Sequence, residues 1–110
     1  MMDEQFEFLK DVAKLLEFIS KTSFIVTAGE LWRPPEMQAL YLQQGKSKAA
    51  HSKHQDRLAI DLNFFTQEKR FATKAELKEI GGYWESLNKK NRWGGNFHTI
   101  EDTPHFERNI

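Results

Sequence analysis

The eight residues LAIDLNFF, at positions 58–65, place a carboxylate in the middle of an otherwise apolar run. Their alternation predicts a β-strand whose even-numbered residues share one face, with Asp61 on the other. A carboxylate at such a position is costly unless it is paired, hydrogen-bonded or bound to a metal. The fold must therefore give Asp61 a partner, either in a metal site or in an ordinary ion pair or turn.

Two histidines complete a possible metal ligand set with this aspartate. His54 lies shortly before Asp61, and His105 lies in the later segment DTPHFE at 102–107. The chain has no cysteine, so a metal must be bound by histidines and carboxylates. Two imidazoles and one carboxylate bind zinc and leave its fourth position to water, as in catalytic zinc sites. We therefore predict Zn²⁺ on His54, Asp61 and His105. Taken singly, a histidine is more often a surface or core residue than a ligand, so the prediction rests on the set.

Four further polar residues have predicted roles around this site. Asp102 can accept a proton from the water and pass it to a leaving amine, or it can be an ordinary turn aspartate in Asp-Thr-Pro. Arg33, at an expected strand-to-helix junction, can stabilise an oxyanion, or it can form a surface cation–π pair with Trp32. Ser52 and Glu107 can orient the ligand imidazoles.

Hydrophobic periodicity predicts three helices and three strands. The helices are expected over 3–21, 31–44 and 73–88, and the strands over 24–27, 58–65 and 105–107, with a polar loop over 45–53. The strand at 24–27 is expected to be buried, and Gly81-Gly82 is expected to kink or divide the third helix.

The ends and faces of these helices have their own signals. Asp3 is expected to cap the first helix, and Thr73 with Glu76 is expected to form a capping box on the third. The buried face of the first helix is expected to contain residues spaced by three and four positions. These are Phe6, Leu9, Val12, Ala13, Leu16 and Ile19. Phe8, Leu15 and Phe18 widen the apolar face, so the helix is expected to pack on two sides.

Composition limits the classes of protein to which the chain can belong. Its 110 residues predict a single domain, 1–110. The 16 basic and 16 acidic residues cancel, which argues against a nucleic-acid partner. No apolar run approaches the roughly 20 residues of a membrane span, and the acidic N-terminal segment is unlike a secretory signal. We expect a monomer.

Four short motifs occur in order along the chain. They are GELWRPPEMQ at 29–38, SKHQDRLAID at 52–61, WGGNF at 93–97 and DTPHFE at 102–107. Together they resemble the family of zinc D-Ala-D-Ala carboxypeptidases and L-alanyl-D-glutamate endopeptidases, which includes VanX, VanY and small phage endolysins. The resemblance covers residues 6–108.

The resemblance implies an α+β fold of the Hedgehog/DD-peptidase type, with a small antiparallel sheet and flanking helices. It implies zinc on the three residues predicted above, Arg33 as the partner of the substrate carbonyl and oxyanion, and Asp102 as general base and acid. Arg57 stands where many members have glycine, so we expect a differently built turn after His54. Asp102 stands where many members have glutamate, although similar phage endolysins have aspartate.

The implied function is hydrolysis of an amide in the peptide stem of peptidoglycan, at L-Ala–D-Glu or D-Ala–D-Ala. Such an enzyme would be made in the bacterial cytoplasm without a signal peptide and would act on the cell wall after release, as phage endolysins do. The alternative is a non-catalytic zinc-binding or cell-wall-binding virion module with the same fold.

Overall fold

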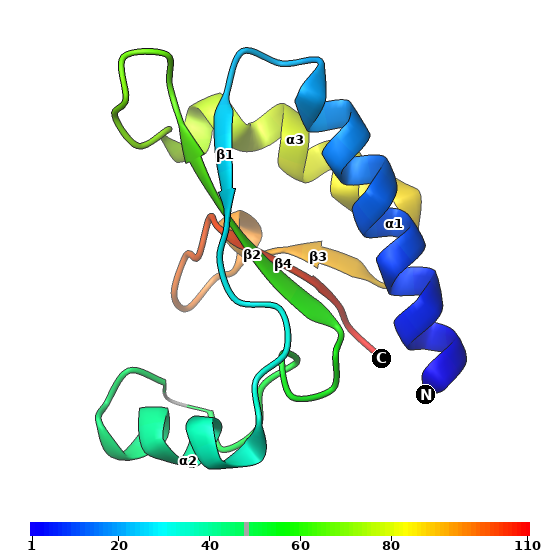
Figure 1. The fold of residues 1–110 in the computed structure, drawn as a ribbon, viewed down its shortest axis with the longest axis vertical. Helices are drawn as coiled ribbons and strands as arrows, with labels where there is room; N and C mark the ends of the chain where they lie inside the picture. Colours follow the sequence, from blue (N-terminus) through cyan, green and yellow to red (C-terminus); the bar gives the residue numbers. More distant parts are fainter. Residues whose placement is uncertain (48) are drawn as a thin grey trace.

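The computed structural model describes residues 1–47 and 49–110; one position of the expected 45–53 loop, residue 48, lies outside the described residues. Figure 1 shows the elements in chain order. They are α1 (Met2–Ser20), β1 (Ile25–Ala28), α2 (Pro35–Gln43), β2 (Ala59–Phe65), α3 (Lys74–Leu87), β3 (Asn91–Trp93), the 3-10 turn η1 (Gly94–Asn96) and β4 (His105–Arg108).

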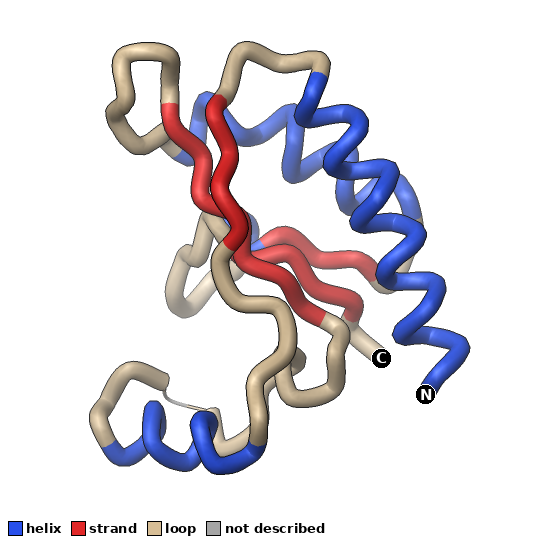
Figure 2. The backbone as a smooth tube through the Cα atoms, viewed as in Figure 1, coloured by secondary structure: helices blue, strands red, loops and turns tan. Residues whose placement is uncertain are grey.

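The strands form an antiparallel sheet in the order β1-β2-β4-β3. Helices α1 and α3 contact each other and lie together on one side of the sheet, whereas α2 lies apart from both (Figure 2). The fold is therefore α+β, with a small antiparallel sheet and flanking helices, as predicted. Among the described residues, no helix is long and apolar enough to cross a membrane.

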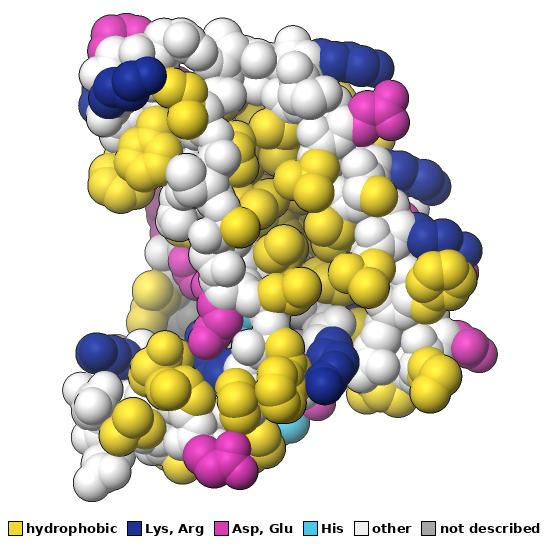
Figure 3. Space-filling model, in the orientation of Figure 1, with side chains coloured by type: hydrophobic (Ala, Val, Ile, Leu, Met, Phe, Trp, Pro, Cys, Tyr) yellow, Lys and Arg dark blue, Asp and Glu magenta, His cyan; other side chains and the backbone are white. Residues whose placement is uncertain are grey.

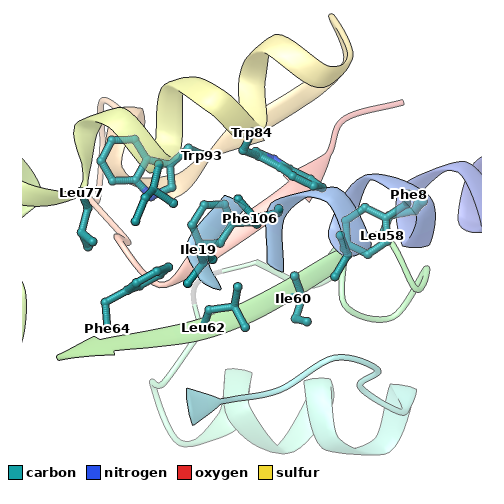
Figure 4. Packing of buried hydrophobic residues seen from close by; sticks show 13 residues of the cluster. Phe8, Ile19, Leu58, Ile60, Leu62, Phe64, Leu77, Trp84, Trp93 and Phe106 are labelled. Atoms are coloured by element: carbon teal, nitrogen blue, oxygen red, sulfur yellow. The ribbon is translucent and has the colours of Figure 1, made fainter. Parts of the chain in front are cut away.

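The core lies between β2 and β4 on one side and α1 and α3 on the other (Figure 4). The alternation predicted for β2 is confirmed, because Ile60, Leu62 and Phe64 are buried in this core while Asp61 is half-buried on the opposite face. Trp84 of α3 packs edge-on against Phe106 of β4 at 6.0 Å between ring centroids.

Only one part of the wide apolar face predicted for α1 is buried, so the expected packing on two sides is wrong. Phe6, Leu9 and Leu16 are exposed, and the buried hydrophobic residues of the helix are Phe8, Val12, Leu15 and Ile19. The helix carries apolar residues on more than one stripe, so spacing alone does not select the buried one. Contacts from other elements do: Phe8 meets Trp84 at 5.6 Å, and the carboxylate of Asp11 meets Arg108.

The first helix also begins differently from the prediction. Met1 is the N-cap residue, without a side-chain hydrogen bond, and Asp3 lies in the first turn. There the negative charge of Asp3 still interacts favourably with the positive end of the helix dipole.

The capping box of α3 is confirmed. The Thr73 hydroxyl accepts a hydrogen bond from the Glu76 N–H, and the Glu76 carboxylate accepts one from the Thr73 N–H. The glycine pair does not divide the helix, which runs unbroken from Lys74 to Leu87. A side chain at Gly81 would stand 2.1 Å from the ring of Trp93, so this glycine lets the helix approach a buried tryptophan.

The strand expected to be buried at 24–27 is an edge strand. In β1, Ile25 and Val26 are half-buried and the last two residues are exposed. Apolar side chains line a hollow between β1 and α1, visible in Figure 3. The β-branched run indicated a strand, but its place in the sheet depends on which strands pair with it.

Candidate metal centre and active site

Two of the three predicted ligands face each other across the sheet. In the antiparallel pairing of β2 with β4, Asp61 stands directly opposite His105. The carboxylate Oδ1 of Asp61 lies 3.3 Å from Nδ1 of His105. Side chains at opposed positions of neighbouring strands share one face, so the sheet register itself brings this pair together.

The third residue arrives from the turn before β2. His54 is buried, with its side chain 3% exposed, and its Nε2 lies 3.4 Å from Oδ2 of Asp61. The His54 and His105 rings are 5.1 Å apart between centroids. One donor atom from each of His54, Asp61 and His105 falls within 4.8 Å of the others.

Each imidazole has its remaining nitrogen engaged by a fixed acceptor. Nδ1 of His54 lies 3.0 Å from the main-chain oxygen of Leu31, and Nε2 of His105 lies 2.7 Å from Oε1 of Glu107. A hydrogen bond of this kind sets the tautomer and turns the other nitrogen toward a metal. The donor set therefore fits zinc: two oriented imidazole nitrogens and a carboxylate converge, as a three-ligand catalytic site requires.

The charges of the cluster are strongly coupled. Burial by itself would raise the pKa of Asp61, but hydrogen bonds and charge from His105 and His54 lower it to about 2. Burial would likewise lower the pKa of His105, but hydrogen bonds to Asp61 and Glu107, and their charges, raise it to about 9. In the metal-free protein, the site thus stabilises a positive charge at His105.

Asp102 lies beside the cluster, with Oδ2 4.0 Å from Nδ1 of His105 and a side chain 51% exposed. Partial burial and the charge of Asp61 raise its pKa, against the lowering effect of the nearby His105 and Arg33. A carboxylate with a raised pKa next to a metal centre is suited to taking up and releasing a proton.

The WGGNF motif supports the turn that contains Asp102. The Asp102 N–H donates to the Gly94 oxygen at 2.9 Å, and the Trp93 Nε1 donates to the Thr103 oxygen at 2.9 Å. A Cβ at Gly94 would lie 2.1 Å from the main-chain oxygen of Asp102. The glycine is therefore required for close approach of two backbone segments.

Arg33 is held in place by side chains on both sides. Its Nε donates to Oε1 of Glu30 at 2.6 Å, its second terminal nitrogen also pairs with Glu30, and its first donates to Oε1 of Gln38 at 2.6 Å. The guanidinium lies 4.8 Å from the ring centre of Tyr41. A guanidinium has five N–H donors, so one on each terminal nitrogen is left for a ligand.

The guanidinium of Arg33 lies over Tyr41 and not over Trp32, which is contacted by Arg57 at 4.3 Å. Ser52 accepts a hydrogen bond from the main-chain N–H of His54 at 3.2 Å. Within the described residues, the His54 ring is oriented by Leu31 and not by Ser52.

The predicted residues line one cleft of about 260 Å³. Its walls are Arg33, Ser52, His54, Asp61, Asp102 and His105, joined by Tyr41, Lys46 and Ser47. Glu107 lies behind His105, and its side chain is only 9% exposed. The sequence pattern indicates no role in the site for Glu30, Gln38, Tyr41 and Lys46, although the first two lie within the motif at 29–38.

A family model described as D-alanyl-D-alanine carboxypeptidase, of the M15 peptidases, matches residues 45–108. That segment contains His54, Asp61, Asp102 and His105. The chain belongs to the M15 peptidase family. The predicted family is thereby confirmed. No curated protein matches this M15 peptidase significantly.

Among solved structures, the M15 chain is similar to the Serratia marcescens L-Ala D-Glu endopeptidase ChiX. The TM-score is 0.73 at 18% sequence identity, over 93% of this chain and 77% of that chain. At this identity the similarity shows the fold.

Arg57 adopts a left-handed conformation in the turn after His54, with φ of 60°. Glycine populates this region without strain, whereas other residues rarely do. In this M15 peptidase the arginine therefore occupies a backbone conformation of the type that glycine favours.

Proposed function

We propose that this chain is a zinc-dependent peptidase that hydrolyses an amide in the peptide stem of peptidoglycan. The observation that carries the proposal is the convergence of His54, Asp61 and His105, with both outer imidazole nitrogens engaged. Membership of the M15 peptidases supports the reaction class.

The three residues of the cluster would hold the zinc. A zinc ion in such a site polarises a carbonyl and lowers the pKa of a bound water to about 7. Glu107 and the Leu31 carbonyl fix the two imidazoles, which keeps the donor atoms in place without further reorganisation.

Asp102 acts as general base and then as general acid. Its carboxylate stands at the edge of the cluster, half-exposed to a ligand in the cleft, and can take a proton from water and deliver it to the leaving amine. Arg33 uses its two remaining N–H groups on the oxygen that becomes negative in the tetrahedral intermediate. Because Glu30 and Gln38 hold the guanidinium, its direction is set before substrate binds.

The bond cut would be L-Ala–D-Glu or D-Ala–D-Ala, in keeping with the family description and with the activity for which the similar Serratia enzyme is named. We further propose a role of the phage endolysin kind, in degrading the bacterial wall; the four motifs in their order support it.

The test is incubation of purified, zinc-loaded protein with peptidoglycan, with and without a chelator, followed by mass analysis of the fragments. We expect a new amine that appears only with metal present, and the fragment masses identify the bond. Absence of fragments from protein holding one zinc per chain would favour the non-catalytic virion module.

Two variants separate the roles of the residues. Asp102→Ala is expected to abolish hydrolysis while zinc stays bound; Glu101→Ala, next to it in the chain and paired with Lys74, is the control. His105→Ala is expected to lose zinc, with the exposed His98→Ala as its control. Full activity of Asp102→Ala would contradict the mechanism.

A further inference from the structure

The cleft contains a second cation that the proposed mechanism does not use. Lys46 lines the same cleft as the metal cluster and Arg33, and its Nζ lies 5.9 Å from the ring centre of Tyr41. The Arg33 guanidinium lies 4.8 Å from the same ring centre. Two positive groups, Arg33 and Lys46, thus lie near the ring of Tyr41 in the cleft.

The backbone at the end of α2 places Lys46 there. The Lys46 N–H donates to the Tyr41 oxygen at 2.9 Å, and the Gly45 N–H donates to the Leu42 oxygen at 3.2 Å. Gly45 has φ of 74°. These are the two hydrogen bonds and the left-handed residue of a Schellman motif, which reverses the chain at a helix end. The helix cap therefore holds the backbone of Lys46 beside that of Tyr41.

The two cations differ in how their charge is neutralised. Arg33 is paired with Glu30, and its side chain is 12% exposed. None of the ion pairs formed among residues 1–47 and 49–110 includes Lys46. The cleft therefore offers one ammonium group to a ligand carboxylate.

The substrates of the proposed function carry a carboxylate on the leaving-group side. D-Glu linked through its γ-carboxyl keeps a free α-carboxylate next to the nitrogen of the L-Ala–D-Glu bond. A terminal D-Ala likewise carries its α-carboxylate next to the nitrogen of the D-Ala–D-Ala bond. In both cases the carboxylate carbon is two bonds from the amide nitrogen, so the carboxylate enters the same cleft as the reacting bond, and Lys46 lines that cleft.

We propose that Lys46 is a specificity residue that binds the α-carboxylate of the substrate residue whose amine leaves. This inference rests on the proposed function and assigns one part of its substrate. A lysine ammonium is a compact charge that pairs with carboxylates, and a lost hydrogen bond to a charged group weakens binding by about ten- to a hundredfold.

The test compares two stem peptides that differ in one group: the leaving residue has either a free α-carboxylate or a carboxamide. The wild-type protein should show a kcat/KM about ten- to a hundredfold higher for the carboxylate. Lys46→Met should lose this preference, and Lys46→Arg should keep most of it. Lys53→Met is the control, because its Nζ donates to the Ile110 oxygen and it does not line the cleft.

Binding gives a readout that does not depend on turnover. The Kd values of both peptides are measured on zinc-loaded Asp102→Ala protein, with and without Lys46→Met. Loss of hydrolysis of both peptides by wild-type protein would refute the proposed function, whereas the Kd ratio would still report on Lys46. A carboxylate preference that persists in Lys46→Met, or a variant equally weakened for both peptides, would overturn the proposal.

Discussion

Two adjacent glycines of α3 should respond to alanine in opposite ways. A Cβ at Gly81 would lie 2.1 Å from Cε3 of Trp93, whereas a Cβ at Gly82 would meet no atom within 4 Å. Both glycines lie inside the same helix, where alanine is favoured over glycine by about 1 kcal/mol. Gly82→Ala should therefore stabilise the protein by about 0.5–1 kcal/mol.

At Gly81 the same helical gain is opposed by a steric clash. Ordinary contact begins near 3.4 Å, so the Trp93 ring must move, yet it is 1% exposed and a Cβ at Gly95 would lie 2.3 Å from it on another side. Overpacking of this kind costs about 1–3 kcal/mol, and loss of the Trp93–Thr103 hydrogen bond adds about 1 kcal/mol. The net effect of Gly81→Ala should be destabilisation by about 1–3 kcal/mol.

The assay is urea unfolding of both variants, followed by tryptophan fluorescence, with thermal melts in parallel. The two variants should differ by about 1.5–4 kcal/mol, or roughly 6–17 °C in Tm for a chain of this size. Gly81→Ala should also weaken zinc binding. Trp93 donates a hydrogen bond to the main-chain oxygen of Thr103, which lies in the turn between Asp102 and the predicted ligand His105. Equal stability of the two variants would refute the packing argument.

Four further predictions concern the charges and caps. In metal-free protein the pKa of His105 is raised to about 9, so zinc must displace a proton from this residue at pH 7. The zinc affinity at pH 7 should therefore be about a hundredfold lower than the zinc affinity above pH 9. Calorimetry should show about one proton released per zinc ion bound. In the metal-free protein, the stability that His105 contributes should be complete below its usual pKa of 6.5 and be lost as pH rises through 9. Asp11→Ala should cost about 3 kcal/mol in urea unfolding, since among the described residues it leaves the buried Arg108 with the half-buried Glu4 as its one charged partner. A cost below about 1 kcal/mol would contradict this. Thr73→Ala should lower stability by about 1 kcal/mol through loss of the α3 cap, measured by Tm.

The sequence by itself determined the features that depend on neighbours along the chain. Alternation defined β2 and placed Asp61 opposite its apolar face, because side chains of a strand point to alternate sides whatever surrounds it. The Thr73–Glu76 pair defined the start of α3, because a capping box closes within one turn. The motifs indicated the family, and residues 54, 61, 102 and 105 do line one cleft.

Tertiary structure alone decided which of several equivalent local solutions was used. Helix α1 offers more than one apolar stripe, and Trp84 and Arg108 select the one with Phe8 and Asp11. The metal cluster follows the same rule: Asp61 and His105 lie 44 residues apart, and the pairing of β2 with β4 brings them together. Contacts between residues far apart in the chain depend on which segments the fold brings together, and the spacing of residues along one helix or strand does not contain that information.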